Sequence, residues 1–497
     1  MTNTHRRPSL TGFFAFVVLW VILATFNFGF GTSELNPLQG ALTCPSPAPS
    51  STSTCIEMTN AQFGYVTAGF TVGGFVGSLC LSPLKAVLPI LGSSSKAALI
   101  LSGLWNVAGG LVQAYAGSWP ILALGRLLMG IGSGIALTIV PGFLNDISPP
   151  ALQGSIGVLN QLSIVIGILV AQALGVSSLG DKGSNRWRIV PVISAAIALA
   201  QLLLSPFAIE CPSDSKEPDS IRKKLWKTEP QESNGHDQAR EVEEPLLTPE
   251  EPDADTGSNH SGSLHSPPEK HSVFSLLRLA LTFGTLNGEE DEIRKGTRMI
   301  IFTQMAQQLS GINAVLYYST GILSDVLKNG GGSKEDDDKT AKLIGLGITV
   351  VNFLMTFPPI PLIDERRVGR KRLLQISSGT MAISALALSL SMLNSASVPA
   401  AVSIVTFTAG FSAGLGAIPF LILPELVPRS VIPSASSLGI ACNWLANITL
   451  SLIFLPLKDA LGGYVFFIFA AIDAIIFITI TGYYRYKPIS NIRSRPE

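Results

Sequence analysis

Apolar segments alternate with short polar ones along most of the chain, and one long polar stretch divides them into two groups. Six apolar segments precede that stretch, at about 11–35, 61–84, 96–116, 120–143, 154–178 and 188–209. Six more follow it, at about 297–327, 341–363, 372–394, 399–424, 432–456 and 463–484. Each is close to the roughly 20 residues that a helix needs to cross the hydrocarbon core of a membrane. The pattern predicts an all-α membrane protein with twelve transmembrane helices in two six-helix bundles.

The long polar stretch also predicts the domain organisation. We expect an N-terminal six-helix bundle over 1–209, a cytosolic loop over 210–296, and a C-terminal six-helix bundle with a cytosolic tail over 297–497. The loop is rich in Ser, Pro, Glu and Lys, so its centre, about 228–270, is predicted to be disordered. Two pieces of the loop, Ile221–Lys227 and Val273–Leu279, are predicted to be amphipathic helices that lie on the bundles.

The composition agrees with a membrane protein. Hydrophobic residues make up 47% of the chain and charged residues 14%, whereas soluble domains carry about 25% charged residues. The formal net charge is zero, which argues against nucleic acid as a partner. Basic residues gather on one side of the predicted spans, and the positive-inside rule therefore puts both termini in the cytosol. The first apolar run is too long for a secretory signal, so we expect no cleaved leader.

One predicted span, 297–327, carries an unusual row of amides. Gln304, Gln307 and Gln308 follow i, i+3, i+4 spacing and so share one helix face. Amides are costly in hydrocarbon unless they are hydrogen-bonded, so this face should turn toward protein or a water-filled cavity. Such amides can bond a neighbouring helix, or they can bind a neutral ligand rich in hydroxyl groups. Because Asn313 and two tyrosines follow on the same segment, we favour the ligand site.

The string QQLSGIN at 307–313, followed by Tyr317 and Tyr318, resembles the seventh transmembrane helix of the sugar porters. The sugar porters are the hexose-transporter branch of the major facilitator superfamily, and the chain looks like a fungal-type member. Further stretches resemble other spans of that family: GRLLMG at 125–130 the fourth, NQL at 160–162 the fifth, Val351–Asn352 the eighth, IPF at 418–420 with PEL at 424–426 the tenth, and Asn443–Trp444 the eleventh.

The resemblance implies a secondary transporter that moves a hexose or similar sugar by alternating access, as a facilitator or a proton symporter. The sequence shows no catalytic constellation, so we expect no enzyme, no cofactor and no metal. We also expect a monomer whose partners are the sugar, protons in the symporter case, and membrane lipid. The implied substrate-binding residues are Gln161, Gln307, Gln308, Asn313, Asn352, Phe420, Asn443 and Trp444, and the implied outer gate is Tyr317 and Tyr318.

The chain departs from the family in the charged clusters that tie the cytosolic helix ends together. The cluster between the second and third spans is replaced by Pro89–Ser94, and Gln153 stands where a basic residue is usual. The C-terminal half keeps its cluster. We therefore expect a cytosolic latch that is weakened in the N-terminal bundle, and a resting state that leans inward-open. The predicted latch residues are Asp146, Arg366, Arg367, Arg370 and Glu425.

A second departure lies in the first span, where proton-coupled relatives carry an aspartate and this chain has Gly31. Glu34 lies about one helical turn further on, and Arg126 is a cation inside the membrane that needs a partner. We predict that the two side chains meet. The pair would be either a proton-coupling site or a plain intramembrane ion pair.

Several alternatives stay open from the sequence. A non-transporting sugar receptor on the same fold, signalling through the long loop, is the rival function. Cys44 and Cys55 flank a short loop and could form a disulfide or remain free thiols. The protein could lie in a vacuolar or a plasma membrane.

Overall fold

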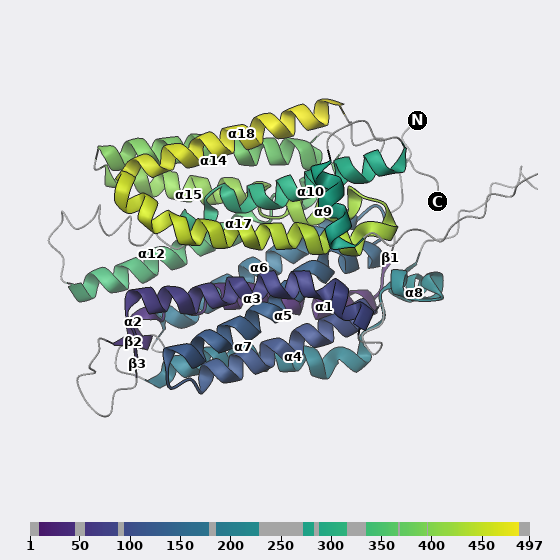
Figure 1. Cartoon of the computed structure of the whole chain (residues 1–497), viewed down its shortest axis with the longest axis horizontal. Helices are drawn as coiled ribbons and strands as arrows, with labels where there is room; N and C mark the ends of the chain where they lie inside the picture. The colour runs from purple at the N-terminus through teal and green to yellow at the C-terminus, as the bar shows by residue number, and fades with distance from the viewer. Residues whose placement is uncertain are drawn as a thin grey trace, which may run out of the picture.

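The computed structural model describes residues 9–44, 55–87, 94–177, 185–227, 272–282, 288–315, 334–365, 368–394 and 396–486. Long helices, roughly parallel or antiparallel, form two groups that lie one above the other in Figure 1. We call α1 to α7 the N-terminal bundle and α10 to α18 the C-terminal bundle. The two bundles meet where α17 packs against α3 and α12 packs against α6.

The N-terminal bundle follows the predicted spans closely. Thr11 caps the first helix by accepting a hydrogen bond from the Phe14 amide, and Ser94 caps α4 in the same way through the Ala97 amide. The α-helices are α1 (Gly12–Ser33), α2 (Gln39–Leu42), α3 (Asn60–Val87), α4 (Ser95–Ala114), α5 (Trp119–Ile147), α6 (Gln153–Val176) and α7 (Ile189–Leu204). Short 3-10 turns η2 (Asn185–Arg188), η3 (Ser205–Phe207) and η4 (Pro212–Asp214) border α7 and the segment after it.

The C-terminal bundle contains both long helices and broken ones. The α-helices are α10 (Glu289–Leu309), α12 (Lys334–Met355), α13 (Pro359–Leu362), α14 (Gly369–Leu393), α15 (Ser397–Ala413), α16 (Ile418–Ile422), α17 (Ile432–Leu461) and α18 (Val465–Tyr486). The 3-10 turns are η6 (Leu423–Glu425), η7 (Arg429–Val431) and η8 (Gly462–Tyr464).

Both amphipathic helices expected beside the long loop are present. They are α8 (Pro218–Leu225) and α9 (Val273–Leu281). The first, α8, begins at Pro218, three residues earlier than predicted. It also ends earlier, because β4 (Trp226–Lys227) leaves the helix to pair antiparallel with β1 (Ser9–Leu10). The predicted disorder at 228–270 lies outside the described residues.

Cys44 and Cys55 form a disulfide. The bond joins β2 (Thr43–Cys44) to β3 (Ile56–Glu57), which pair in parallel. Of the two alternatives that the sequence left open, the structure therefore has the paired one. The bond closes the loop between α1 and α3 at the end of the bundle opposite α8.

Eleven helices in the described part of the chain are long and apolar enough to cross a membrane. These eleven confirm the predicted multi-span, all-α architecture. The remaining predicted span, 297–327, is described only in part. Its helix, α10, begins earlier, in an acidic turn at Glu289–Glu292, and the segment beyond residue 315 lies outside the described residues.

Two predicted spans are not continuous helices. The span predicted at 399–424 is present as Val398–Glu425, but it is not one continuous α-helix, because α15 ends at Ala413 and α16 starts at Ile418, leaving 414–417 without α-helical structure. Gly414 caps the first piece, and glycine readily leaves helical geometry. The predicted seventh span is also interrupted. Gly311 takes a φ of 92° between the end of α10 and a helical turn at 312–315.

The contact between α3 and α5 depends on glycine. A Cβ at Gly73 would collide with the carbonyl oxygen of Leu127, and one at Gly130 would collide with that of Phe70. Gly77 and Gly134 repeat the pattern one turn further along each helix. Small residues let two membrane helices approach at backbone distance. These glycines are therefore needed for packing.

We predict that Gly73→Ala destabilises the protein by about 1–3 kcal/mol, because the new methyl group would push α3 away from α5. Gly64→Ala, on the same helix, is the matched control, since nothing lies within 4 Å of the added Cβ. Thermal unfolding of the two purified variants in one detergent compares them. Equal melting temperatures would contradict the account of the α3–α5 contact.

Candidate functional site

The glutamines of α10 bond the backbone that the break between α15 and α16 exposes. Gln307 Nε2 donates to the carbonyl oxygens of Leu415 and Gly416, at 2.9 Å each. Gln304 Nε2 donates to the carbonyl oxygen of Pro419 at 3.1 Å. Carbonyls freed from a helix at membrane depth need donors. The glutamines of α10 therefore supply hydrogen-bond donors to two carbonyl groups of the 414–417 break and to one just after it, and those carbonyl groups supply acceptors to the glutamines.

The same amides also bond α17. Asn443 Nδ2 donates to Gln307 Oε1 (2.8 Å) and to Gln304 Oε1 (3.1 Å), while Asn443 Oδ1 accepts from Gln308 Nε2 (3.0 Å). Asn313 Nδ2 donates to Gln308 Oε1 (2.6 Å) and to Asn447 Oδ1 (3.1 Å). We call this set of side chains the amide cluster: Gln304, Gln307, Gln308, Asn313, Asn443 and Asn447.

The amide cluster brings together four of the predicted sugar-binding residues, and it adds Asn447, which the sequence analysis missed. Asn447 could have been found, because it follows Asn443 at i+4 on the same face. Every bond described for the cluster is made to protein, as expected for helix–helix bonding, the alternative that the sequence analysis disfavoured. The row of amides therefore does not by itself identify a ligand site.

Asn352 lies apart from the amide cluster. Its Oδ1 accepts a hydrogen bond of 2.6 Å from Ser412 Oγ, which ties α12 to α15. Both side chains are buried. The described bonds of Asn352 do not include the α10 amides, but its partner Ser412 lies three residues before Leu415, whose carbonyl oxygen accepts from Gln307.

On the N-terminal side, α6 presents two buried amides toward the break. Gln161 Nε2 lies 3.4 Å from the position that a Cβ on Gly416 would take. The neighbouring Asn160 is 1% exposed, and among the described residues neither its side-chain oxygen nor its nitrogen has a hydrogen-bond partner. Because unpaired buried amides are unusual, Asn160 is a candidate to bond a hydroxyl. The sequence analysis did not select it.

Trp444 crosses from the C-terminal bundle into the N-terminal one. Its ring makes edge contacts with Phe28 (5.6 Å between centroids) and Phe70 (5.8 Å), and it covers Gly74, where a Cβ would overlap the indole. The indole nitrogen is buried, and no residue in the described ranges accepts a hydrogen bond from it. Phe420 belongs to the same buried apolar cluster. Trp444 therefore fastens the two bundles together and keeps an unused donor at their boundary.

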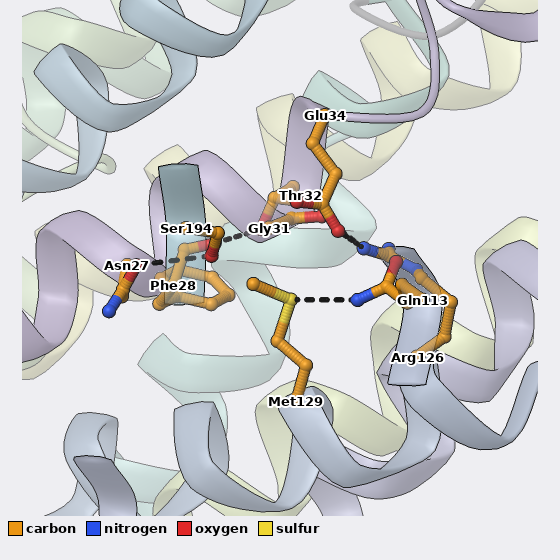
Figure 2. A network of polar contacts seen from close by, with 9 residues as sticks. All are labelled: Asn27, Phe28, Gly31, Thr32, Glu34, Gln113, Arg126, Met129 and Ser194. Atoms are coloured by element: carbon orange, nitrogen blue, oxygen red, sulfur yellow. Dashed lines mark hydrogen bonds and ion pairs between the residues drawn. The ribbon is translucent and has the colours of Figure 1, made fainter. Parts of the chain in front are cut away.

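Glu34 and Arg126 form a fully buried ion pair. Arg126 Nη1 lies 2.9 Å from Glu34 Oε1 and also donates to the Gly31 carbonyl oxygen. Figure 2 shows the two side chains facing each other, with Gln113 beside the guanidinium. The guanidinium carbon lies 4.4 Å from the centroid of the Phe70 ring, a cation–π contact. Since Phe70 also touches Trp444, one chain of contacts joins the ion pair to the bundle boundary.

At the other end of the bundles, Arg370 bonds Glu425 at 2.6 Å and lies 3.6 Å from Asp364. Asp364 Oδ2 in turn accepts from the Ser155 amide (2.8 Å) and from Ser155 Oγ (3.2 Å) at the start of α6. A carboxylate is favourable at a helix N-terminus. Asp364 thus links the C-terminal bundle to the N-terminal one, a link that the sequence analysis did not foresee.

Of the remaining predicted latch and gate residues, only Asp146 lies in the described part of the chain. Asp146 accepts a hydrogen bond from Cys211 Sγ at 3.2 Å instead of joining Arg370. Burial, reinforced by the charge of Asp146, raises the pKa of the Cys211 thiol, which therefore stays protonated at neutral pH. Arg366, Arg367, Tyr317 and Tyr318 lie outside the described residues. Across the described ranges, no group of three or more His, Cys, Asp or Glu side chains is arranged to hold a metal.

The sequence matches a family described as "Sugar (and other) transporter" over residues 17–484. Mouse solute carrier family 2, facilitated glucose transporter member 3, is 30% identical over 510 residues, covering 98% of this chain and 91% of that protein. A probable metabolite transport protein of Saccharomyces cerevisiae is 27% identical over 515 residues, covering 99% of this chain and 96% of that protein.

A solved structure gives the fold comparison. The proton:xylose symporter XylE of the major facilitator superfamily, from E. coli, solved with 6-bromo-6-deoxy-D-glucose bound, superposes with a TM-score of 0.70. The match covers 96% of each chain at 18% sequence identity. This likeness confirms the predicted major facilitator fold.

We predict that Asp364→Asn loosens the contact between the bundles at α6, because a neutral amide cannot serve both the α6 amide groups and Arg370. Spin labels at Ala151 and Phe357, in a variant lacking Cys80, Cys211 and Cys442, measure the separation. The distribution of distances should shift to longer values. Glu365→Gln, which changes an exposed neighbour, is the control, and equal distributions in both variants would refute the link.

We predict that Glu34→Gln lowers stability by about 3–5 kcal/mol, because it leaves the Arg126 charge buried without its ionic partner. The double variant Glu34→Leu with Arg126→Met should recover much of the loss, since an apolar pair of similar volume replaces the buried ions. Melting temperatures test both statements. A Glu34→Gln variant as stable as the starting protein would exclude an ionised pair.

Proposed function

The chain belongs to the sugar (and other) transporter family, and from that premise we propose that it is a secondary transporter moving a hexose or similar sugar by alternating access. The observation that carries the proposal is the arrangement at the bundle boundary. There the amide cluster, Gln161 and Trp444 gather around the broken helices, at the level where the two bundles touch.

The amide cluster would exchange partners during transport. Amides that bond carbonyls and one another in the described state can bond sugar hydroxyls instead, with little change in the number of hydrogen bonds. Gln307 and Gln308 would hold hydroxyl groups, together with Asn313, Asn443, Asn352 and Gln161. Trp444 would turn its indole N–H and one ring face to the pyranose, beside Phe420. Tyr317 and Tyr318 would form the outer gate.

The helix breaks support such an exchange. Gly311 and the 414–417 segment interrupt two helices next to the amide cluster. Each break would allow the backbone on its two sides to move separately. Unwound backbone that lines a central site is a recurring device in transporters. We propose that closure over the sugar happens at these two breaks.

The latch sets the resting state. Both termini would lie in the cytosol, which puts Arg370, Glu425 and Asp364 at the cytosolic end. There Asp364 would supply the link that is weakened because the basic cluster is missing and Gln153 replaces the usual basic residue. The described state has this link closed, and the expected inward-open resting state stays a prediction.

The finer assignments are proposals as well. The carrier would work as a monomer, surrounded by lipid, in a vacuolar or plasma membrane, as a facilitator or a proton symporter. Glu34 would neutralise Arg126 in place. The relatives reported above are named as transporters, and no observation favours the receptor alternative. Uptake of labelled glucose by proteoliposomes containing the purified protein tests the function directly. Uptake no greater than in empty liposomes would reject it.

We predict that Gln307→Ala weakens sugar binding by about 1–3 kcal/mol, because the site loses hydrogen bonds that its amide would make to hydroxyl groups. That corresponds to a rise of roughly 5- to 150-fold in the dissociation constant. Calorimetry with the purified protein measures it. Gln375→Ala is the control, since Gln375 bonds Thr481 between α14 and α18, away from the cluster. Equal affinity in the two variants would remove Gln307 from the site.

A further inference from the structure

Asp473, near the middle of α18, is an acid that the proposed transport site does not use. Its side chain is 0% exposed. Neither carboxyl oxygen has a hydrogen-bond partner in the described part of the chain. An acid buried this way at membrane depth is rare, and such residues usually have a function.

The face of α18 that carries Asp473 is otherwise apolar. Phe466, Phe469, Ile476 and Ile480 share the buried stripe and belong to one hydrophobic cluster. The opposite wall is α14, aligned antiparallel by two hydrogen bonds of 2.8 Å, from Gln375 to Thr481 and from Ser389 to the Gly463 carbonyl. Met381 and Ala385 of α14 belong to the same cluster. The carboxyl group is therefore enclosed by hydrocarbon.

The charged groups on the packed elements lie toward the helix ends. Burial is the one influence on the Asp473 carboxyl in the described residues, and no charged side chain acts on it. On α14, Arg370, Lys371 and Arg372 lie in the first turn, and on α10 the charged residues lie between Glu289 and Arg298, before its apolar half. On α17, Lys458 and Asp459 lie in the last turns, and on α18 Arg485 lies at the end. The titratable but uncharged groups on these elements are Cys442 on α17, Tyr464 on η8, and Tyr483, Tyr484 and Tyr486 on α18.

This setting favours the neutral acid. An ionised carboxylate removed from water without a counter-ion costs several kcal/mol. The protonated form avoids that cost, so burial favours the neutral acid in the described conformation. Asp473 can release the proton only when water or a cation reaches it in another conformation.

The position of Asp473 connects it to the proposed sugar site. Phe469 lies one helical turn away on the same face, and its ring fills the space beside Gly311, where a Cβ would collide with it. Gly311 is the break between Gln308 and Asn313 of the amide cluster. Movement at that break would press on Phe469, which lies one helical turn from Asp473.

We propose that Asp473 is a proton-binding site whose loading is coupled to sugar transport through Phe469 and Gly311. The proposal rests on the function proposed above. One proton binds the Asp473 carboxylate when the site is open to one side of the membrane. The carrier changes conformation with the side chain as the neutral acid, and the proton leaves on the other side. No other bond is made or broken, and sugar and proton travel together.

Proteoliposomes with an imposed pH gradient test the proposal. A gradient of about one unit can drive about tenfold accumulation when one proton accompanies each sugar. The wild-type protein should accumulate labelled glucose toward that limit. Asp473→Asn and Asp473→Leu should lose the accumulation but keep exchange of labelled for unlabelled glucose without a gradient. Asp219→Asn, at an exposed acid on α8, is the control and should accumulate as the wild type does.

The leucine variant fits the apolar stripe, which guards against failure to fold. An infrared band of a protonated carboxyl, present in the wild type and absent from Asp473→Leu, provides a second readout that needs no transport. Accumulation retained by Asp473→Asn would overturn the proposal, as would a wild type that exchanges glucose but ignores the gradient. If the wild type exchanges glucose but ignores the gradient, the proposed carrier function stands and only the proton site is rejected. If the wild type does not exchange glucose, the carrier function and the proton site are both rejected.

Discussion

The requirement that buried amides and carbonyls be hydrogen-bonded at membrane depth governs the centre of this protein. The segment 414–417 frees carbonyl groups that a continuous helix would have bonded itself, and Gln307 reaches across from α10 to satisfy two of them. Asn443 then satisfies the glutamine oxygens. These bonds join α10 to the segment after α15 and to α17. The same amide groups can also bond other partners, such as hydroxyl groups, in another conformation.

Two separate contacts join the two bundles around this centre. Trp444 inserts between Phe28 and Phe70 of the N-terminal bundle, whereas Asp364 bonds the start of α6 at the end that carries Arg370. Phe70 also carries the Arg126 guanidinium on its face. A carrier that alternates must break one of these contacts while keeping the other. The separation of the aromatic contact from the charged one suits that requirement.

Hydropathy alone located the spans well, because a run of apolar residues long enough to cross a membrane has few other structures to adopt. The pairing of Glu34 with Arg126 could be anticipated for a similar reason, since a buried charge needs an opposite one nearby. The break after Ala413 was missed because hydrophobicity continues across it. Gly414 and Gly416 were a signal for it, although glycine is also common in unbroken membrane helices.

Long-range partners were the least predictable part. Spacing on a helix shows which residues share a face, but it does not show which helix that face meets. Asn352 therefore looked like a companion of the α10 amides, while its described partner is Ser412. Asp364 received no role in the sequence analysis, because nothing in its neighbourhood of the sequence identifies Ser155 as its partner. Asp473 was not noticed, although it is an acid inside the apolar segment at 463–484; the sequence does not show whether another helix supplies it with a partner.

The account depends most on the claim that the amide cluster trades its protein partners for sugar hydroxyls. A structure determined with saturating glucose tests this most directly. We expect glucose at the bundle boundary, with hydroxyl groups bonded to Gln307 and Gln308 and the bonds from Gln307 to Leu415 and Gly416 broken. Glucose bound elsewhere, with those two bonds intact, would contradict it.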